Sequence, residues 1–179
     1  MIYVFLANGF EECEALAPID ILRRAGFQLK TVGVSGKTAI GSHNITITCD
    51  ITTDDVTFED LEAVILPGGM PGTINLENDK TVQAAIDYAH KNGLLIGAIC
   101  AAPSVLGHKG ILNDKKATCF PGFEKDLLGA KYIDTAVVRD GNIITAKGAG
   151  VAFQFGFELL SYLKDEKTAN DLKIQMMFK

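Results

Sequence analysis

The chain has 179 residues, enough for one domain with a sizeable core, and we expect a single domain over residues 1–179. Hydrophobic residues make up 47% and charged residues 22%, the balance of an ordinary globular protein. The net charge of -5 and the lack of a basic cluster exclude a nucleic-acid partner from our expectations, and no apolar run is long enough to span a membrane.

Short apolar segments alternate with helical segments along the chain. The expected strands are 2–7, 27–34, 45–49 (with the alternation of an edge strand), 63–66, 94–99, 135–139 and 142–145. The expected helices are 11–25, 79–91, 104–108, 151–163 and 166–177. This order is typical of a mainly parallel sheet that helices cover on both faces. Active sites of such folds lie at the carboxyl ends of strands, so we expect loops 8–14, 68–72 and 100–103 to be neighbours.

The segment 94–103, Leu-Leu-Ile-Gly-Ala-Ile-Cys-Ala-Ala-Pro, is the most informative part of the chain. An apolar strand ends at Cys100, and small residues and a helix follow, which is the composition of a nucleophile elbow. The N-terminus of that helix favours a thiolate. Cys100 is therefore the candidate nucleophile; the alternative is a buried cysteine that acts as a small hydrophobic residue.

The other cysteines suggest neither a disulfide nor a metal centre. The chain has 4 cysteines, which lie far apart and form no C-x-x-C pair. We therefore expect no disulfide and no zinc site. The N-terminal segment has no positive region and only a short apolar run, so we expect no export signal and a cytoplasmic protein.

A carboxylate on the first helix is the candidate partner of the cysteine. Glu14 falls on the apolar helix face that also carries Ala17, Pro18, Ile21 and Ala25. Burial there raises the pKa of a carboxyl group, so Glu14 can stay protonated and donate a hydrogen bond to a thiolate. The alternative is an acidic residue placed in a first turn by the helix dipole.

The neighbouring Glu11 and Glu12 fit that dipole alternative, and we expect Glu12 to point toward the solvated side of the helix. The glycines after the 63–66 strand do not have the spacing of a nucleotide-binding loop. Close backbone approach explains them better, with the N–H groups of Gly69 and Ala101 forming an oxyanion site near the nucleophile. A tight turn without a ligand is the alternative.

Histidine offers no evident general base. Of the 3 histidines, His90 and His108 lie in last turns of expected helices, where a cation suits the dipole. His43 lies in a polar turn, where we expect it to be exposed.

Several motifs occur in one order along nearly the whole chain: Glu11-Glu12-Cys13-Glu14, Pro18 with Asp20, Arg23-Arg24-Ala25-Gly26, Leu66-Pro67-Gly68-Gly69 and Ala98-Ile99-Cys100-Ala101-Ala102-Pro103. With them the chain resembles the ThiJ/PfpI superfamily, specifically the branch of the parkinsonism-associated protein deglycase. The resemblance implies a flavodoxin-like three-layer α/β/α sandwich with a mainly parallel central sheet and a nucleophile elbow, usually as a homodimer. It implies that Cys100 is the reactive cysteine, Glu14 its partner and Gly69 the glycine of the oxyanion site.

The chain departs from the family pattern at a few positions. Many members carry a histidine where this chain has Phe120, and the protease-like branch has a histidine where this chain has Ala101. His43 stands where close relatives often have an arginine at the dimer-side rim, and Gly148-Ala149-Gly150 replaces a Gly-Pro-Gly. We therefore place Gly68, His43, Phe120 and Gly148 at the pocket.

The resemblance implies a cofactor-free, metal-free enzyme that acts on reactive 2-oxoaldehydes such as methylglyoxal and glyoxal, or on their protein adducts. Such a glyoxalase III-like or deglycase-type hydro-lyase or hydrolase protects against carbonyl and oxidative stress, with Cys100 as nucleophile and Glu14 as general acid and base. A redox sensor that oxidises Cys100 needs the same two residues. A holdase with a vestigial pocket and a cysteine peptidase are the remaining alternatives.

Overall fold

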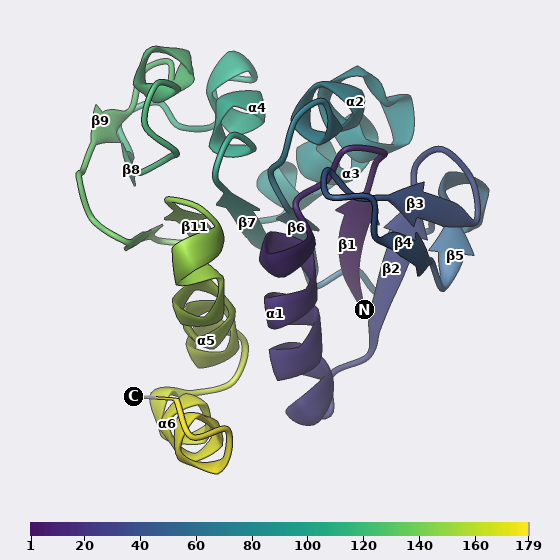
Figure 1. Ribbon diagram of the computed structural model, residues 1–179. Helices are drawn as coiled ribbons and strands as arrows, with labels where there is room; N and C mark the ends of the chain where they lie inside the picture. Colours follow the sequence, from purple (N-terminus) through teal and green to yellow (C-terminus); the bar gives the residue numbers. More distant parts are fainter. Residues whose placement is uncertain (179) are drawn as a thin grey trace.

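The computed structural model describes residues 1–178 as a sheet between two layers of helices (Figure 1). The strands are β1 Ile2–Leu6, β2 Leu29–Gly33, β3 Thr38–Ile40, β4 Thr46–Thr48, β5 Ile51–Thr52, β6 Ala63–Leu66, β7 Leu95–Ile99, β8 Lys116–Ala117, β9 Lys131–Tyr132, β10 Val137–Asp140 and β11 Ile143–Ala146. The helices are α1 Glu12–Arg24, α2 Gly72–Asn78, α3 Lys80–Lys91, α4 Pro103–His108, α5 Ala152–Leu163 and α6 Glu166–Gln175. Three-residue helical turns cover Thr53–Asp55, Glu124–Asp126 and Ala149–Val151.

The central sheet has the strand order β10-β11-β7-β6-β1-β2-β5. Its pairings are parallel, except that β10 runs antiparallel to β11 at one edge. The sequence prediction of a mainly parallel sheet inside a flavodoxin-like sandwich is therefore confirmed. The expected strands 135–139 and 142–145 are present as β10 and β11, which pair antiparallel.

The two faces of the sheet bury separate apolar cores, because successive side chains of a strand point to opposite faces. Along β1, Ile2, Val4 and Leu6 pack with α1, α5 and α6, whereas Tyr3 and Phe5 pack with α3 and α4. In Figure 1, α1 and α5 lie side by side on the near face of the sheet. Each buried strand residue thus contributes to one of two cores.

The structure differs from the sequence prediction in the region after β2. The segment 45–49, expected as an edge strand, forms β4 and pairs with β3 in a separate two-stranded sheet; β5 is the edge of the central sheet instead. Helix α2 begins at Gly72, inside a segment expected as a loop. These elements are two to seven residues long, too short to show a reliable hydrophobic period.

Within residues 1–178, none of the helices combines the length and the apolar character that crossing a bilayer requires.

Candidate active site

The three loops expected to be neighbours follow three adjacent strands of the sheet. Strands β7, β6 and β1 lie next to one another and are parallel, so their carboxyl ends meet at one edge. Cys100 directly follows β7, Gly68 and Gly69 lie just after β6, and Glu14 lies in the first turn of the helix that follows β1. The sheet therefore brings all four residues to one place.

Cys100 occupies a strained turn between β7 and α4. Its φ of 66° lies in the left-handed region, which a residue other than glycine adopts only when its surroundings hold it there. Two backbone hydrogen bonds hold it: the N–H of Cys100 donates to the carbonyl of Ala146 at 2.9 Å, and its carbonyl accepts from the N–H of Phe120 at 2.8 Å. Ala101 and Ala102 are fully buried beneath the turn. The local structure is the predicted nucleophile elbow.

Glu14 is 1% exposed and contacts the cysteine through a hydrogen bond between the two side chains. Its Oε2 accepts the N–H of Gly68 at 2.9 Å, and the carboxyl group also accepts the N–H of Ala149. The prediction that Glu14 lies on the buried face of its helix is confirmed, since Ala17, Pro18 and Ile21 are buried too.

Burial dominates the ionisation of both groups. It raises the pKa of Glu14 to about 7, although hydrogen bonds from Cys100, Gly68 and Ala149 act in the opposite direction. Burial, and then the charge and hydrogen bond of Glu14, raise the pKa of Cys100 to about 12. The helix N-terminus alone therefore does not give a free thiolate, contrary to the sequence prediction, because desolvation outweighs the N–H groups. Above pH 7 the pair as a whole holds one proton.

Two backbone N–H groups face the sulfur of Cys100. Those of Gly69 and Ala101, the pair predicted as oxyanion donors, form hydrogen bonds with the side chain and lower its pKa against the effect of burial. A Cβ at Gly68 would lie 2.6 Å from Cβ of Cys100 and 2.6 Å from Oε2 of Glu14, so only glycine fits between these two side chains. The glycines are thus explained by close backbone approach.

A groove of about 210 Å³ lies close to Glu14. It is lined by Phe120, Pro121, Lys147, Gly148, Ala149, Gly150 and Val151. A Cβ at Gly148 would lie 3.7 Å from Oε1 of Glu14 and 3.2 Å from Cδ2 of Phe120, so the carboxyl group and the aromatic ring flank this glycine. The predicted pocket residues Phe120 and Gly148 therefore lie beside the Cys100–Glu14 pair.

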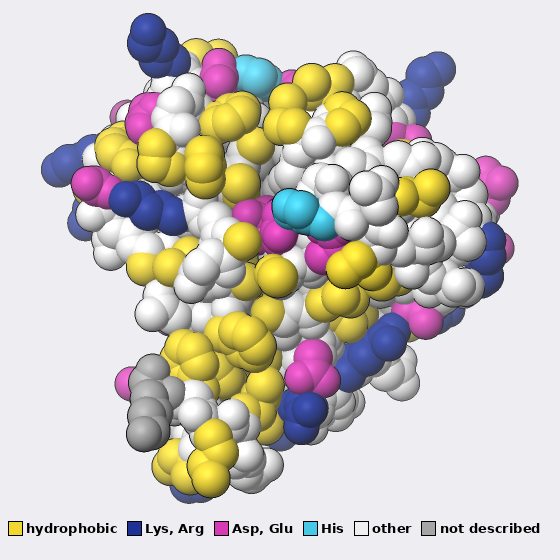
Figure 2. All heavy atoms as spheres, viewed as in Figure 1, with side chains coloured by type: hydrophobic (Ala, Val, Ile, Leu, Met, Phe, Trp, Pro, Cys, Tyr) yellow, Lys and Arg dark blue, Asp and Glu magenta, His cyan; other side chains and the backbone are white. Residues whose placement is uncertain are grey.

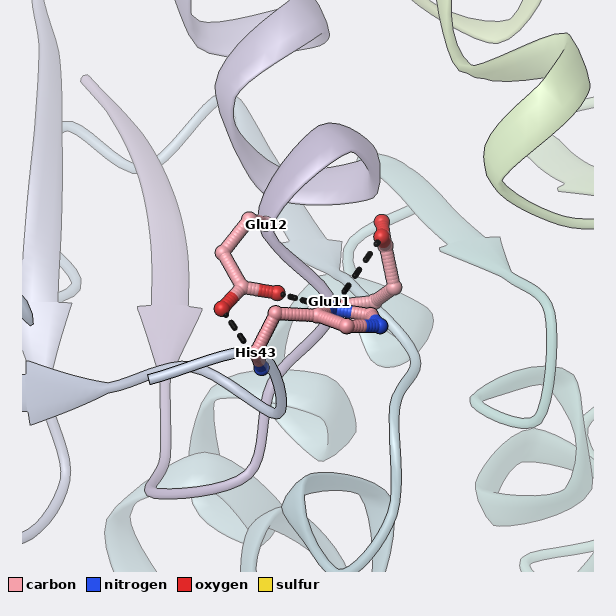
Figure 3. A group of neighbouring side chains, drawn as sticks. All are labelled: Glu11, Glu12 and His43. Atoms are coloured by element: carbon pink, nitrogen blue, oxygen red, sulfur yellow. Dashed lines mark hydrogen bonds and ion pairs between the residues drawn. The ribbon is translucent and has the colours of Figure 1, made fainter. Parts of the chain in front are cut away.

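Glu12 and His43 form a separate contact, and here the sequence prediction for Glu12 is wrong. Its carboxylate is 4% exposed rather than solvated, because it accepts hydrogen bonds from the turn between β3 and β4. The N–H of His43 donates to Oε1 at 2.8 Å, and Nδ1 of His43 pairs with Oε2 at 2.8 Å (Figure 3). The N–H of Ile45 donates to Oε1 at 3.4 Å. We call this set of contacts the Glu12 clasp.

The hydrogen bonds of the clasp also shift the pKa values of Glu12 and His43. Burial favours a higher pKa for Glu12, but the hydrogen bonds from His43 and Ile45 outweigh it, and the pKa of Glu12 is lowered. The same contact raises the pKa of His43, whose side chain is 70% exposed. His43 thus forms an ion pair with Glu12. Among the described residues, its other polar contacts are with Ser42 and Glu11, and it does not contact Cys100.

Within residues 1–178, one group of side chains has the spacing of a metal site. It consists of Glu11, Glu12 and His43, whose potential ligand atoms lie within 4.8 Å of one another (Figure 3). Their hydrogen bonds occupy most of these atoms: Oε2 of Glu11 caps α1 by accepting the N–H of Glu14 at 2.7 Å. The ion pair and the helix cap together account for the arrangement, and we assign no metal to it.

The remaining histidines lie away from the pair. His108 ends α4 and contacts Glu77 and Asp126, and His90 lies in the last turn of α3, as expected for structural residues. Within residues 1–178, no histidine is hydrogen-bonded to Cys100.

Two contributors escaped the sequence analysis. The N–H of Ala149 donates to Glu14 from a loop that lies 135 positions later in the chain (149 − 14 = 135). A local sequence pattern cannot predict a contact over such a separation. The helix cap by Glu11 does have a signal, because it lies three residues before Glu14, the usual spacing between an N-cap side chain and the N–H that it accepts.

The chain matches the DJ-1/PfpI family over residues 1–162. It is 33% identical to protein dj-1beta of Drosophila melanogaster over 172 residues, 94% of this chain and 92% of that protein. It is 30% identical to a deglycase of Pyrococcus horikoshii over 161 residues, 88% of this chain and 96% of that protein.

Solved structures agree. Oxidized DJ-1 of Toxoplasma gondii superposes with a TM-score of 0.95 at 28% identity, covering 99% of this chain and 97% of that one. A DJ-1 superfamily protein of Salmonella typhimurium superposes with a TM-score of 0.94 at 32% identity, covering 99% and 98%. The chain belongs to the DJ-1/PfpI family.

Proposed function

We propose that this protein is a cysteine-dependent glyoxalase or deglycase-type enzyme that converts reactive 2-oxoaldehydes, or their adducts on proteins, to 2-hydroxy acids without a cofactor. The observation that carries the proposal is the hydrogen-bonded pair of half-buried Cys100 and buried Glu14, with the N–H groups of Gly69 and Ala101 at the sulfur. The reaction needs one proton that can move between this pair and the substrate. The relative named as a deglycase adds support.

In the first step Glu14 takes the thiol proton of Cys100, and the sulfur attacks as the thiolate. Its sulfur forms a bond to the aldehyde carbon, and the aldehyde oxygen takes the proton from Glu14 to give a neutral hemithioacetal. The N–H groups of Gly69 and Ala101 face the sulfur. They stabilise the negative charge that develops on the aldehyde oxygen during the attack. Glu14 is left as a carboxylate.

In the second step that carboxylate acts as a base. It removes the proton from the former aldehyde carbon and returns it to the neighbouring carbon through an enediol, which leaves a thioester on Cys100. Water then hydrolyses the thioester, which releases the 2-hydroxy acid and restores the cysteine. One carbon is oxidised and its neighbour reduced, so the sum is RCOCHO plus water giving RCH(OH)COOH, and no external oxidant is needed.

The test is consumption of methylglyoxal by the reduced protein in the absence of glutathione, with lactate measured as product. We expect turnover by the wild type, none by Cys100→Ser, and unchanged turnover by Cys13→Ser, which alters an exposed cysteine. Inactive reduced wild-type protein, or full activity in Cys100→Ser, would overturn the proposal.

The second candidate function is a redox sensor based on the same cysteine. Glu14 and the N–H groups of Gly69 and Ala101 surround the sulfur and could hold the oxygens of a sulfinate. Mass spectrometry after mild peroxide treatment tests this candidate, which requires that Cys100 take up oxygen before the other cysteines. The peptidase alternative has less support, since Ala101 follows the cysteine and no histidine within residues 1–178 is bonded to it.

We also propose that the protein acts as a homodimer in protection against carbonyl and oxidative stress. An apolar groove of about 320 Å³ between α1, the β3–β4 hairpin and α5 supports the dimer. Leu16 is 38%, Ile45 51% and Phe153 45% exposed along it. Figure 2 shows apolar side chains gathered on this face of the molecule, and such a patch favours a second copy of the chain as its cover.

A further inference from the structure

Phe120 presents an apolar ring beside the reactive pair. Its N–H donates to the carbonyl of Cys100, so the position of this residue is tied to the nucleophile by one backbone hydrogen bond of 2.8 Å. The residue nevertheless remains 48% exposed and packs into neither core cluster. Core packing therefore leaves one side of this ring open to the groove that it lines with Gly148.

The groove offers almost no polar side chain to a ligand. Pro121, Ala149 and Val151 contribute apolar surface, and Lys147 is the charged residue of the lining. The ammonium group of Lys147 is already paired with the carboxylate of Asp134. A ligand group that enters this groove therefore meets hydrocarbon and an aromatic ring.

The geometry of Glu14 shows which part of a 2-oxoaldehyde would enter. Oε2 is held by the N–H of Gly68, whereas Oε1 lies beside Gly148, which lines the groove. In the proposed reaction Glu14 passes a proton from the carbon bound to sulfur to the neighbouring carbon. That second carbon, and the R group that it carries, must therefore lie on the Glu14 side of the sulfur.

We propose that this groove is a binding site for the R group of RCOCHO and that Phe120 makes the protein selective for aryl and other bulky apolar R groups over hydrogen. The inference rests on the proposed function for the identity of the reacting aldehyde. An aromatic R group gains both apolar burial and an aromatic contact with Phe120, and hydrogen gains neither. Phe120 is thus a specificity-determining residue, and it has no acid–base role.

The first measurement is kcat/KM for phenylglyoxal and for glyoxal, expressed as a ratio so that a general loss of activity cancels. We expect Phe120→Ala to lower this ratio roughly tenfold relative to the wild type. Phe120→Leu should retain most of the wild-type ratio, because leucine keeps the apolar surface. The matched control is Leu128→Ala, since Leu128 is 51% exposed and lies outside the groove lining.

The second measurement needs no turnover. The rate of alkylation of Cys100 by 2-bromoacetophenone and by bromoacetone, an aryl and a methyl ketone, is followed by mass spectrometry, and Phe120→Ala should again lower the aryl-to-methyl ratio. If wild-type protein turns over neither aldehyde but keeps this dependence on Phe120, the proposed function fails and the groove assignment stands. Ratios that do not change in Phe120→Ala, in either assay, would overturn the assignment.

Discussion

At the residue scale, the candidate site depends on a conflict between burial and charge. Glu14 is buried and Cys100 half-buried, both side chains are ionisable, and two negative charges in that position would repel each other. A single shared proton resolves the conflict. Because this proton can pass between the two side chains, either the sulfur or the carboxylate can act as a base.

The raised pKa of Glu14 predicts how turnover depends on pH. Below pH 7 both groups are protonated and the protein is inactive; one proton is lost as the pH rises through about 7, so kcat/KM should rise through that value to a plateau. Glu14→Gln should lower kcat/KM by roughly 100-fold or more and abolish the rise near pH 7. The measurement is the pH profile of methylglyoxal turnover for both proteins.

If kcat/KM of the wild type does not rise near pH 7, the assignment of Glu14 is contradicted. It is also contradicted if the same rise persists in Glu14→Gln, because that variant has no carboxyl group to titrate at this position.

At the element scale, the Glu12 clasp strengthens the contact between the β3–β4 hairpin and the start of α1. The hairpin belongs to its own small sheet, and its tip contacts the loop ahead of α1 and the first turn of α1. The N–H of Ser42 donates to the carbonyl of Phe10, and Glu12 accepts from the residues that follow. The clasp thereby fixes the segment that leads directly to Glu14.

We expect Glu12→Ala to lower the free energy of unfolding by about 2 kcal/mol, because several hydrogen bonds to a charged and buried group are lost together. Urea unfolding measures this change, and hydrogen exchange at the amides of His43 and Ile45 should become faster. Asp171→Ala is the control, since it removes only an exposed ion pair with Lys167 and should cost under about 0.5 kcal/mol. Equal losses in the two variants would show that the clasp carries no special stability.

At the scale of the whole molecule, the sheet order decides where everything lies. Because β1, β6 and β7 are adjacent and parallel, their following loops converge at one edge and leave α1 and α5 side by side on one face. The apolar groove on that face runs close to the clasp, since Glu12 lines it together with Leu16 and Phe153. A partner copy on this face would therefore lie near the active-site rim.

The dimer proposal predicts that Leu16→Asp shifts the protein from dimer to monomer, because a carboxylate on an apolar interface loses its hydration without gaining a partner. Sedimentation velocity across a range of concentrations measures the shift. Ile74→Asp is the matched control, since Ile74 is also exposed but lies on α2, outside this groove. A wild-type protein that stays monomeric at high concentration would refute the dimer.

The sequence by itself determined the fold class and the two central residues. Strands such as 63–66 and 94–99 are continuous apolar runs, and the long helices show a clear period, so local pattern located them within a residue or two. Cys100 and Glu14 became candidates because each carries a local anomaly, a cysteine at the abrupt end of a strand and a carboxylate on an apolar helix face, and the family resemblance pointed to the same two residues.

Tertiary structure alone decided the rest, because burial and ionisation depend on groups far away in the chain. Glu12 looks like a solvated first-turn acid until the hairpin tip of residues 42–45 closes over it. The raised pKa of Cys100 comes from burial and from Glu14, so no local helix-dipole argument could give its direction. The position of Phe120 beside Gly148 likewise follows from a backbone hydrogen bond to Cys100 that joins two separate loops.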